Sequence, residues 1–112
     1  MDAVRIEGME VTADNTIISI RIRVNYTMRY DGLQVNTHVY DAKGIVRFTE
    51  VNGRQVSMYR LFMSRDEVDK AKGELILKAV IEGKDAERVR IRASIIQEHK
   101  EVEYDENVLS IK

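Results

Sequence analysis

The two histidines, His38 and His99, are the residues of this 112-residue chain best suited to catalysis or metal binding. An imidazole can act as a general base or a metal ligand, but either role requires a suitably placed partner side chain. Neither histidine has another histidine or a carboxylate at a spacing typical of metal ligands. The chain has no cysteine and lacks the common nucleophile, zinc-protease and phosphate-binding motifs. The sequence therefore predicts a protein that is not an enzyme and holds no metal ion or cofactor.

Two rows of arginines are the second feature with chemical potential. They are Arg21, Arg23 and Arg29, and Arg88, Arg90 and Arg92, each row on the outward positions of a segment with two-residue periodicity. If the two segments are neighbouring strands, the rows form one basic surface that can bind phosphate or another polyanion. If they lie in opposite sheets, we expect each row to pair with acidic neighbours, and the net charge of −1 favours this arrangement. The acidic candidates are Glu7, Glu10, Glu74 and Glu82.

Tyrosines and a C-terminal acidic segment are weaker candidates for binding sites. Exposed rings of Tyr26, Tyr30 and Tyr40 could stack on sugars, but the first two are in phase with an apolar face, which favours core packing. The acids of residues 98–106 could offer oxygen ligands to calcium, but they lack the EF-hand spacing. We expect this acidic segment to be a solvated strand edge that discourages aggregation.

Strands with two-residue alternation must position these side chains. Apolar residues occupy every second position from Ile18 to Tyr30, and Val89–Ile95 repeats the pattern, so each segment predicts a strand with one buried face. Leu75–Ile81 is almost continuously apolar and predicts a central strand buried on both faces. In residues 4–11 the phase slips at Gly8, which predicts a β-bulge.

Turn signals connect these segments. Asn52-Gly53 predicts a two-residue hairpin that pairs residues 45–51 with residues 55–63. The turn at residues 41–44 predicts a second hairpin, between residues 35–40 and 45–51, and Asp31-Gly32 predicts a further turn. Residues 102–104 and 108–111 predict short edge strands. Together the segments predict an all-β fold, an antiparallel β-sandwich of seven or eight strands.

One short helix, at about residues 65–72, interrupts the strands. Ser64 and Glu67 form the capping-box pattern, and Gly73 suits the helix C-terminus. Val68 and Ala71 give the helix only a thin apolar edge. We interpret the helix as a brace that carries the chain from one sheet to the other; a partner-binding helix is the alternative.

The composition sets broad limits on the class of protein. Hydrophobic residues make up 44% and charged residues 33%, which is typical of a folded chain, and we expect a single domain over residues 1–112. The near-neutral net charge favours neither nucleic acid nor an anionic membrane surface. No apolar run approaches the roughly 20 residues of a membrane helix, so we expect no membrane insertion. Dense charge of both signs with many isoleucines, valines and arginines is typical of heat-stable proteins.

The number of strands, the turn spacing and the helical crossover before a central strand resemble those of immunoglobulin-like and fibronectin type III-like sandwiches. The resemblance concerns the architecture alone, because the immunoglobulin Cys, Trp, Cys pattern is absent. Domains of this architecture commonly serve as adhesion, assembly or accessory-binding modules, and the resemblance implies a function of that kind.

We therefore predict a non-catalytic interaction or structural module that acts through its surfaces in a homo-oligomer or with another protein. The apolar residues Val108, Leu109 and Ile111 predict a C-terminal strand that adds to a sheet edge, its own or a neighbour's. The alternative is a ligand-binding module that uses the arginine rows or the tyrosines to hold a polyanion or a carbohydrate. The sequence does not indicate a cellular compartment.

Overall fold

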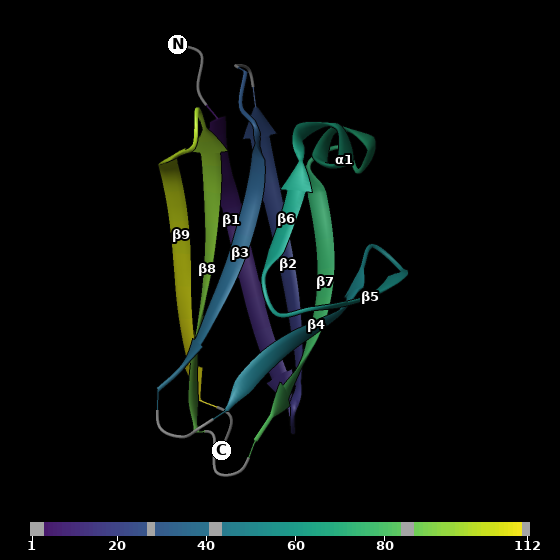
Figure 1. Ribbon diagram of the computed structural model, residues 1–112, viewed down its shortest axis with the longest axis vertical. Coiled ribbons are helices and arrows are strands. Elements are labelled where there is room, and N and C mark those ends of the chain that lie inside the picture. Colours follow the sequence, from purple (N-terminus) through teal and green to yellow (C-terminus); the bar gives the residue numbers. More distant parts are fainter. Residues whose placement is uncertain (1–3, 27–28, 41–43, 84–86, 111–112) are drawn as a thin grey trace.

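The computed structural model describes residues 4–26, 29–40, 44–83 and 87–110, and it shows two antiparallel sheets packed face to face (Figure 1). The five-stranded sheet contains, in spatial order, β1 (Val4–Asp14), β2 (Ile17–Tyr26), β7 (Glu74–Glu82), β4 (Ile45–Val51) and β5 (Arg54–Met58). The four-stranded sheet contains β6 (Leu61–Ser64), β3 (Gly32–Val39), β8 (Arg88–Gln97) and β9 (Lys100–Ser110). These ranges also include one short helix, α1 (Arg65–Lys70). The predicted fold class, an all-β antiparallel sandwich with a short helix, is confirmed.

The described residues form nine strands, and the segment predicted as residues 55–63 is divided between the two sheets. Its first part, in β5, pairs with β4 as far as Met58. Its last part, β6, pairs with β3 in the other sheet. The chain thus changes sheets between Met58 and Leu61, where the sequence contains no glycine or proline to signal the change.

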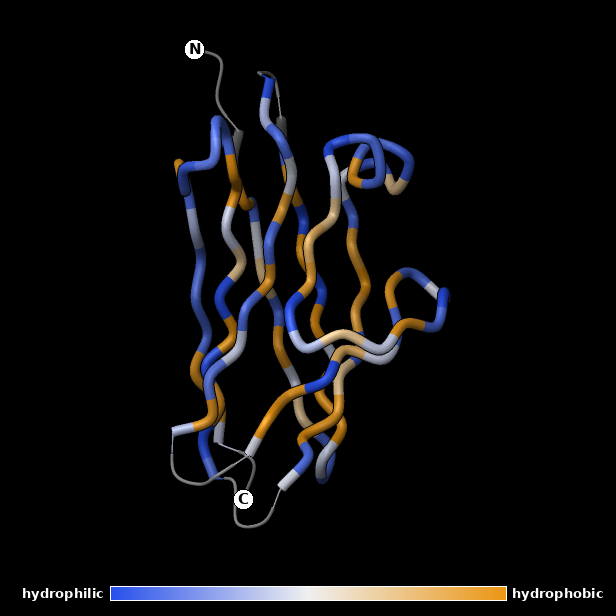
Figure 2. Tube along the Cα trace, in the orientation of Figure 1, coloured by the Kyte–Doolittle hydropathy of each residue, from blue (hydrophilic) through white to orange (hydrophobic). Residues whose placement is uncertain are grey.

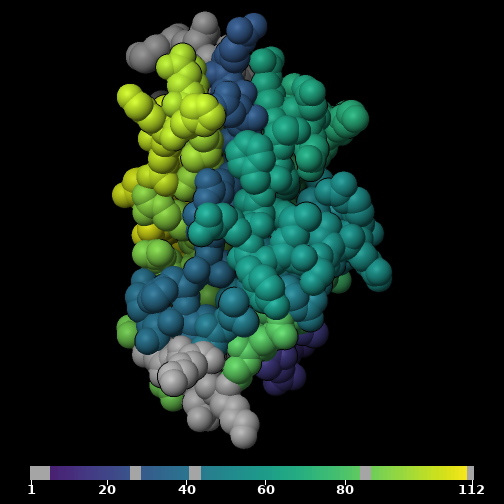
Figure 3. All heavy atoms as spheres, in the orientation of Figure 1, coloured from purple at the N-terminus to yellow at the C-terminus, as the bar shows by residue number. Residues whose placement is uncertain are grey.

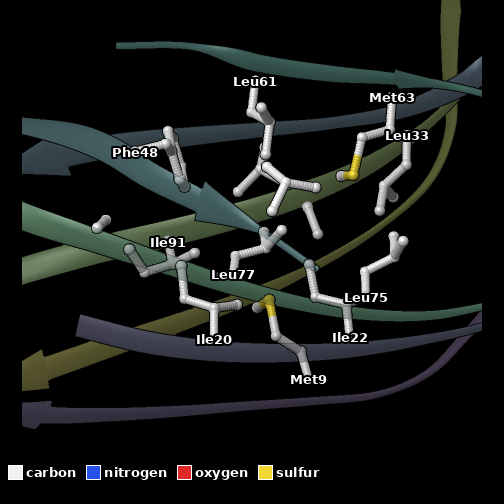
Figure 4. Packing of buried hydrophobic residues seen from close by; sticks show 14 of the residues in the cluster. Met9, Ile20, Ile22, Leu33, Phe48, Leu61, Met63, Leu75, Leu77 and Ile91 are labelled. Atoms are coloured by element: carbon white, nitrogen blue, oxygen red, sulfur yellow. The ribbon is translucent and has the colours of Figure 1, made fainter. Parts of the chain in front are cut away.

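Alternation along the strands builds the core between the sheets (Figure 2). Ile18, Ile20, Ile22 and Val24 of β2 are buried, as predicted. Their counterparts in β8 are Val89, Ile91, Ala93 and Ile95, which are completely buried. Figure 4 shows side chains from both sheets interdigitating in this layer. Each large aliphatic side chain removed from water contributes about 1.5–3 kcal/mol, so this layer is the main stabilising feature of the fold.

Two backbone irregularities lie where the sequence predicted them. The register between β1 and β2 shifts between Ile6 and Gly8, which is the predicted bulge. Asn52 and Gly53 have φ values of 48° and 85°, and Val51 lies opposite Arg54 across the turn. These positive φ values suit a two-residue hairpin turn, and the hairpin of β4 and β5 is confirmed.

The hairpin predicted between residues 35–40 and 45–51 is wrong. β3 pairs with β6 and β8, whereas β4 pairs with β5 and β7 in the other sheet. Most of the predicted turn, residues 41–43, lies outside the described residues. A turn motif specifies a reversal of the chain but not the sheet that the next strand joins, and here β7 provides the neighbour for β4. The turn predicted at Asp31-Gly32 is likewise replaced, because Gly32 begins β3.

Three other strand predictions also needed correction. β7 is central in its sheet, but it is buried on one face only: Leu77 is completely buried, whereas Ile76 is 51% exposed. The strand predicted to run to Tyr30 ends at Tyr26, and the buried Tyr30 follows it outside regular structure. The two short C-terminal strands form one long strand, β9, at the edge of the four-stranded sheet.

The helix connects β6 of one sheet to β7 of the other, as the sequence predicted. Ser64 Oγ accepts a hydrogen bond from the backbone N–H of Glu67 at 3.3 Å, which caps the N-terminus. Gly73, at φ 75°, donates its N–H to the carbonyl of Val68 at 2.9 Å and closes the other end. The Val68 side chain is completely buried in the core, so it anchors the helix to the sandwich. Within the described ranges, no helix is long and apolar enough to cross a membrane.

Candidate interaction surface

The two arginine rows lie in different sheets, so they do not form one basic surface. Arg21 and Arg23 are exposed on β2 in the five-stranded sheet. Arg88, Arg90 and Arg92 lie on the outer face of β8 in the four-stranded sheet. Arg29 is exposed in the segment between β2 and β3. The structure therefore matches the arrangement in which each row meets its own neighbours.

Ion pairs across neighbouring strands cover the outer face of the five-stranded sheet. Arg21 of β2 is paired with Glu74 of β7. Further along, Arg47 Nε lies 2.7 Å from Glu82 Oε1. The same face also holds a 3.5 Å pair between Lys78 and Glu50. Exposed pairs of this kind contribute about 0–1 kcal/mol each, and they leave the face largely charge-balanced.

Arg92 is the centre of a cluster that joins β8 to β9. Its guanidinium group donates to the carboxylates of Glu101 and Glu106, and its Cζ lies 3.7 Å from the centre of the Tyr104 ring. Ser94 Oγ donates to Glu101 at 2.6 Å. The hydrogen bonds from Arg92 are the main reason why the pKa of Glu101 lies below its ordinary value, and those carboxylates in turn raise the pKa of Arg92. The cluster holds the edge strand β9 on β8.

The other two arginines of the β8 row lie beside aromatic and apolar side chains. Arg88 lies over the ring of Tyr40 at 5.2 Å, and that ring meets His38 edge-on at 4.8 Å. Arg90 lies between His38 of β3 and Val108 of β9 in the strand register. Its Nε is buried and has no hydrogen-bond partner among the described residues.

Large apolar side chains share this outer face with the arginines. Phe62, Gln34, Ser94 and Tyr104 are consecutive partners in one row across all four strands. We call the whole surface the aromatic–arginine face. It comprises Gln34, Asn36, His38, Tyr40, Phe62, Arg88, Arg90, Arg92, Ser94, Tyr104, Glu106 and Val108.

The sequence pointed to part of this face and missed the rest. The arginines were candidates because of their periodicity, and Tyr40 because an exposed aromatic ring can stack on a sugar. Phe62 and Tyr104 were not candidates: residues 55–63 were predicted to pair with residues 45–51, which do not lie in the sheet that Phe62 joins, and residues 102–104 were predicted only as a short edge strand. The alternation of buried Leu61 and Met63 around exposed Phe62 is the signal that could have found it. Of the other two candidate tyrosines, Tyr30 is buried, and the side chain of Tyr26 is not among those that the structure describes.

The C-terminal strand residues fall on both sides of β9. Val108 projects outward opposite Arg90, and Leu109 is partly buried opposite Val89, while Ile111 lies outside the described residues. β9 is paired along β8, and its other side faces β1. There Asn107 Nδ2 donates to the carbonyl of Met9 at 3.0 Å. β1 thus lies beside β9, and Val108 is the exposed residue of the predicted edge-pairing set within the described chain.

A hollow of about 350 Å³ lies between α1 and the β4–β5 hairpin, away from the aromatic–arginine face. Its floor is apolar, and two cations and one carboxylate stand at its rim. The lining residues are Val51, Asn52, Arg54, Met63, Glu67, Lys70, Ala71 and Leu75. In the described part of the chain, no group of three histidines and carboxylates is arranged to hold a metal ion.

Comparisons with known proteins add little to this description. The sequence matches no protein-family model and no curated protein. A conjugative transposon lipoprotein from Bacteroides eggerthii has a similar solved structure, with a TM-score of 0.48 and 9% sequence identity over 96% of this chain and 92% of that chain. A likeness at this level supports no statement about function.

Proposed function

We propose that this chain is a non-catalytic β-sandwich interaction module that associates with a second copy of itself through the aromatic–arginine face. One observation carries the proposal. Tyr40, Phe62, Tyr104 and Val108 are 42–55% exposed on one sheet face, next to three arginines. Protein interfaces are enriched in tyrosine, phenylalanine and arginine, and such residues supply most of the binding energy.

The polar groups of this face also favour a covering partner. Arg92 and Tyr104 are already held in place by the cluster on β9, so they lose little side-chain freedom on binding.

The strand order supports the immunoglobulin-like interpretation of the architecture, and with it a single domain. In the constant-type immunoglobulin sandwich, strands A, B and E are neighbours in one sheet, and C, F and G in the other. Here β1, β2 and β7 occupy the first set of places, and β3, β8 and β9 the second, in the same chain order. The departure is β4, which lies beside β7 as strand D does but is followed by β5, β6 and α1.

Sedimentation velocity of two matched variants tests the proposed surface. Val108→Lys places a charge on the aromatic–arginine face, and Ile76→Lys places one on the outer face of the other sheet, at similar exposure of 55% and 51%. We expect Val108→Lys to shift the chain toward the monomer and Ile76→Lys to leave its association unchanged. Equal effects of the two substitutions would contradict the assignment of this face.

Binding of a polyanion is the second candidate function, because Arg88, Arg90 and Arg92 lie side by side with Tyr40 and Tyr104. The low net positive charge of this face argues against polyanion binding. The two carboxylates bound to Arg92 offset two of the three arginines of this face. Titration with heparin at low and high salt tests it, since a phosphate- or sulfate-binding surface loses affinity steeply as salt rises.

A further inference from the structure

We propose that the open edge of β6 and the adjacent hollow form a docking site for an extended peptide that carries an aliphatic residue and, two positions further on, an acidic one. The inference rests on the proposed role as an interaction module, but it concerns a different surface and a different partner. Peptides commonly bind by adding a strand to a sheet edge, where backbone bonds give affinity and pockets for alternate side chains give specificity.

β6 offers an edge suited to strand addition. In the described chain, β3 is its sole strand neighbour. Arg65 donates its N–H to the carbonyl of Asp31 at 3.0 Å, and Met63 lies opposite Leu33 in the same ladder. Because backbone groups alternate in direction along a strand, the N–H and C=O of Phe62 point away from β3, toward the open side. β6 contains no lysine or proline, the residues that commonly protect such edges.

The hollow lies where a side chain of an added strand would point. Met63 of β6 lines it, together with Val51, Ala71 and Leu75. Figure 1 shows α1 and the β4–β5 hairpin projecting on the same side of β6. Residues of both elements line the hollow. β6 itself is part of the surface seen in Figure 3. Side chains of neighbouring strands share the direction of their opposite residues, so the peptide residue opposite Met63 would turn toward the apolar floor.

The charges at the rim select an acidic residue two positions from the aliphatic one, because these two side chains lie on the same face of the added strand. Arg54 and Lys70 are cationic, and Glu67 is the one carboxylate in the lining. Arg54 Nη2 lies 3.7 Å from Glu67 Oε2, and the Arg54 side chain is 66% exposed, so this ion pair is weak. An acidic side chain of the peptide can therefore replace Glu67 as the partner of Arg54. The rim keeps one excess positive charge, which complements an acidic side chain two positions from the aliphatic one.

A capped hexapeptide of sequence TVLTDT, in which the leucine and the aspartate share one face of the strand, is the probe. Amide chemical shifts of the full chain give both the location and the dissociation constant. We expect shifts at the Phe62 and Ser64 amides. Replacing the aspartate of the peptide by asparagine should weaken binding about threefold, the scale of one exposed charge pair. Replacing its leucine by serine should weaken binding at least as much, because the apolar floor would bury the leucine. The exposed Lys70→Glu variant should weaken binding similarly, and Lys100→Glu, on β9, should not.

Three outcomes would overturn the inference. The first is the absence of shifts at Phe62 and Ser64. The second is equal binding of the three peptides. The third is a Phe62 amide that shifts with protein concentration alone, which would make a second copy the occupant of the edge. Peptide binding that survives in Val108→Lys separates this site from the aromatic–arginine face, so either proposal can fail without the other.

Discussion

At the scale of single residues, Gly32 shows how tightly the face of the four-stranded sheet is built. A Cβ added at this position would lie 2.3 Å from the carbonyl oxygen of Met63 and 2.6 Å from the ring of Phe62. The Phe62 ring therefore covers the glycine, and its place on the aromatic–arginine face depends on the missing side chain. The sequence indicated a turn at this glycine, although the close approach of β6 is what requires it.

We predict that Gly32→Ala destabilises the fold by about 1–3 kcal/mol, because backbone atoms of β6 must move to relieve the contact. Gly8→Ala is the matched control, since its Cβ would meet only the mobile guanidinium group of Arg23 at 3.3 Å. Urea unfolding of both variants measures the difference. Equal stability of the two variants would show that β6 is not held as described.

The Arg92 cluster predicts a pH dependence of stability. The pKa of Glu101 is lower in the folded chain than in the unfolded chain, chiefly because Arg92 donates hydrogen bonds to the carboxylate. Its contribution is therefore complete above the unfolded value, about 4.3, and is lost as the pH falls through the lower folded value.

We expect Glu101→Gln to cost about 1 kcal/mol at neutral pH, a figure reduced for the partial exposure of the pair. The difference from the wild type should shrink below about pH 4. Denaturant titrations at several pH values check this, with the exposed Glu98→Gln as a control. A difference that stays constant with pH would show that the charge of Glu101 is not what stabilises β9.

At the scale of elements, local signals predicted what local chemistry determines. The capping box, the Asn52-Gly53 turn and the bulge at Gly8 all lie where the sequence indicated. The hairpin of β8 and β9 was missed because Glu98 and His99 adopt positive φ values of 52° and 65°, which are uncommon for these residues. The sheet that each strand joins depends on distant partners, and so the pairing of β4 could not be read from residues 41–44.

The helix α1 acts as a brace, and Val68 is the residue that tests this role. We predict that Val68→Ser destabilises the fold by about 2–4 kcal/mol, because it leaves a hydroxyl group and a small cavity in the core. Lys70→Ser, on the exposed side of the same helix, should cost far less. Unchanged unfolding of Val68→Ser combined with loss of self-association would instead make the helix a binding element.

At the scale of the whole molecule, the two sheets differ in what they present to solvent. The outer face of the five-stranded sheet is crossed by ion pairs, and the outer face of the four-stranded sheet gathers aromatic side chains and arginines. Periodicity predicted which residues point outward, and hence the candidate arginines. It could not predict their neighbours, because those depend on strand order, and it therefore could not distinguish a basic surface from two separate rows.

The edges of the sandwich also differ. On one side of the sandwich, side chains of β9 bond to the backbone of β1. Glu103 accepts a hydrogen bond from the N–H of Ile6, and Asn107 donates one to the carbonyl of Met9. Polar residues at inward positions of an edge strand also discourage further pairing. The opposite side, at β6, has no such protection in the described chain, and it is the side with the hollow.

The most direct measurement is the molar mass of the wild-type chain in solution, by light scattering over a dilution series. Association through the aromatic–arginine face predicts a mass that is a multiple of 13.0 kDa and falls toward that value on dilution. A mass of 13.0 kDa at every concentration would contradict the account.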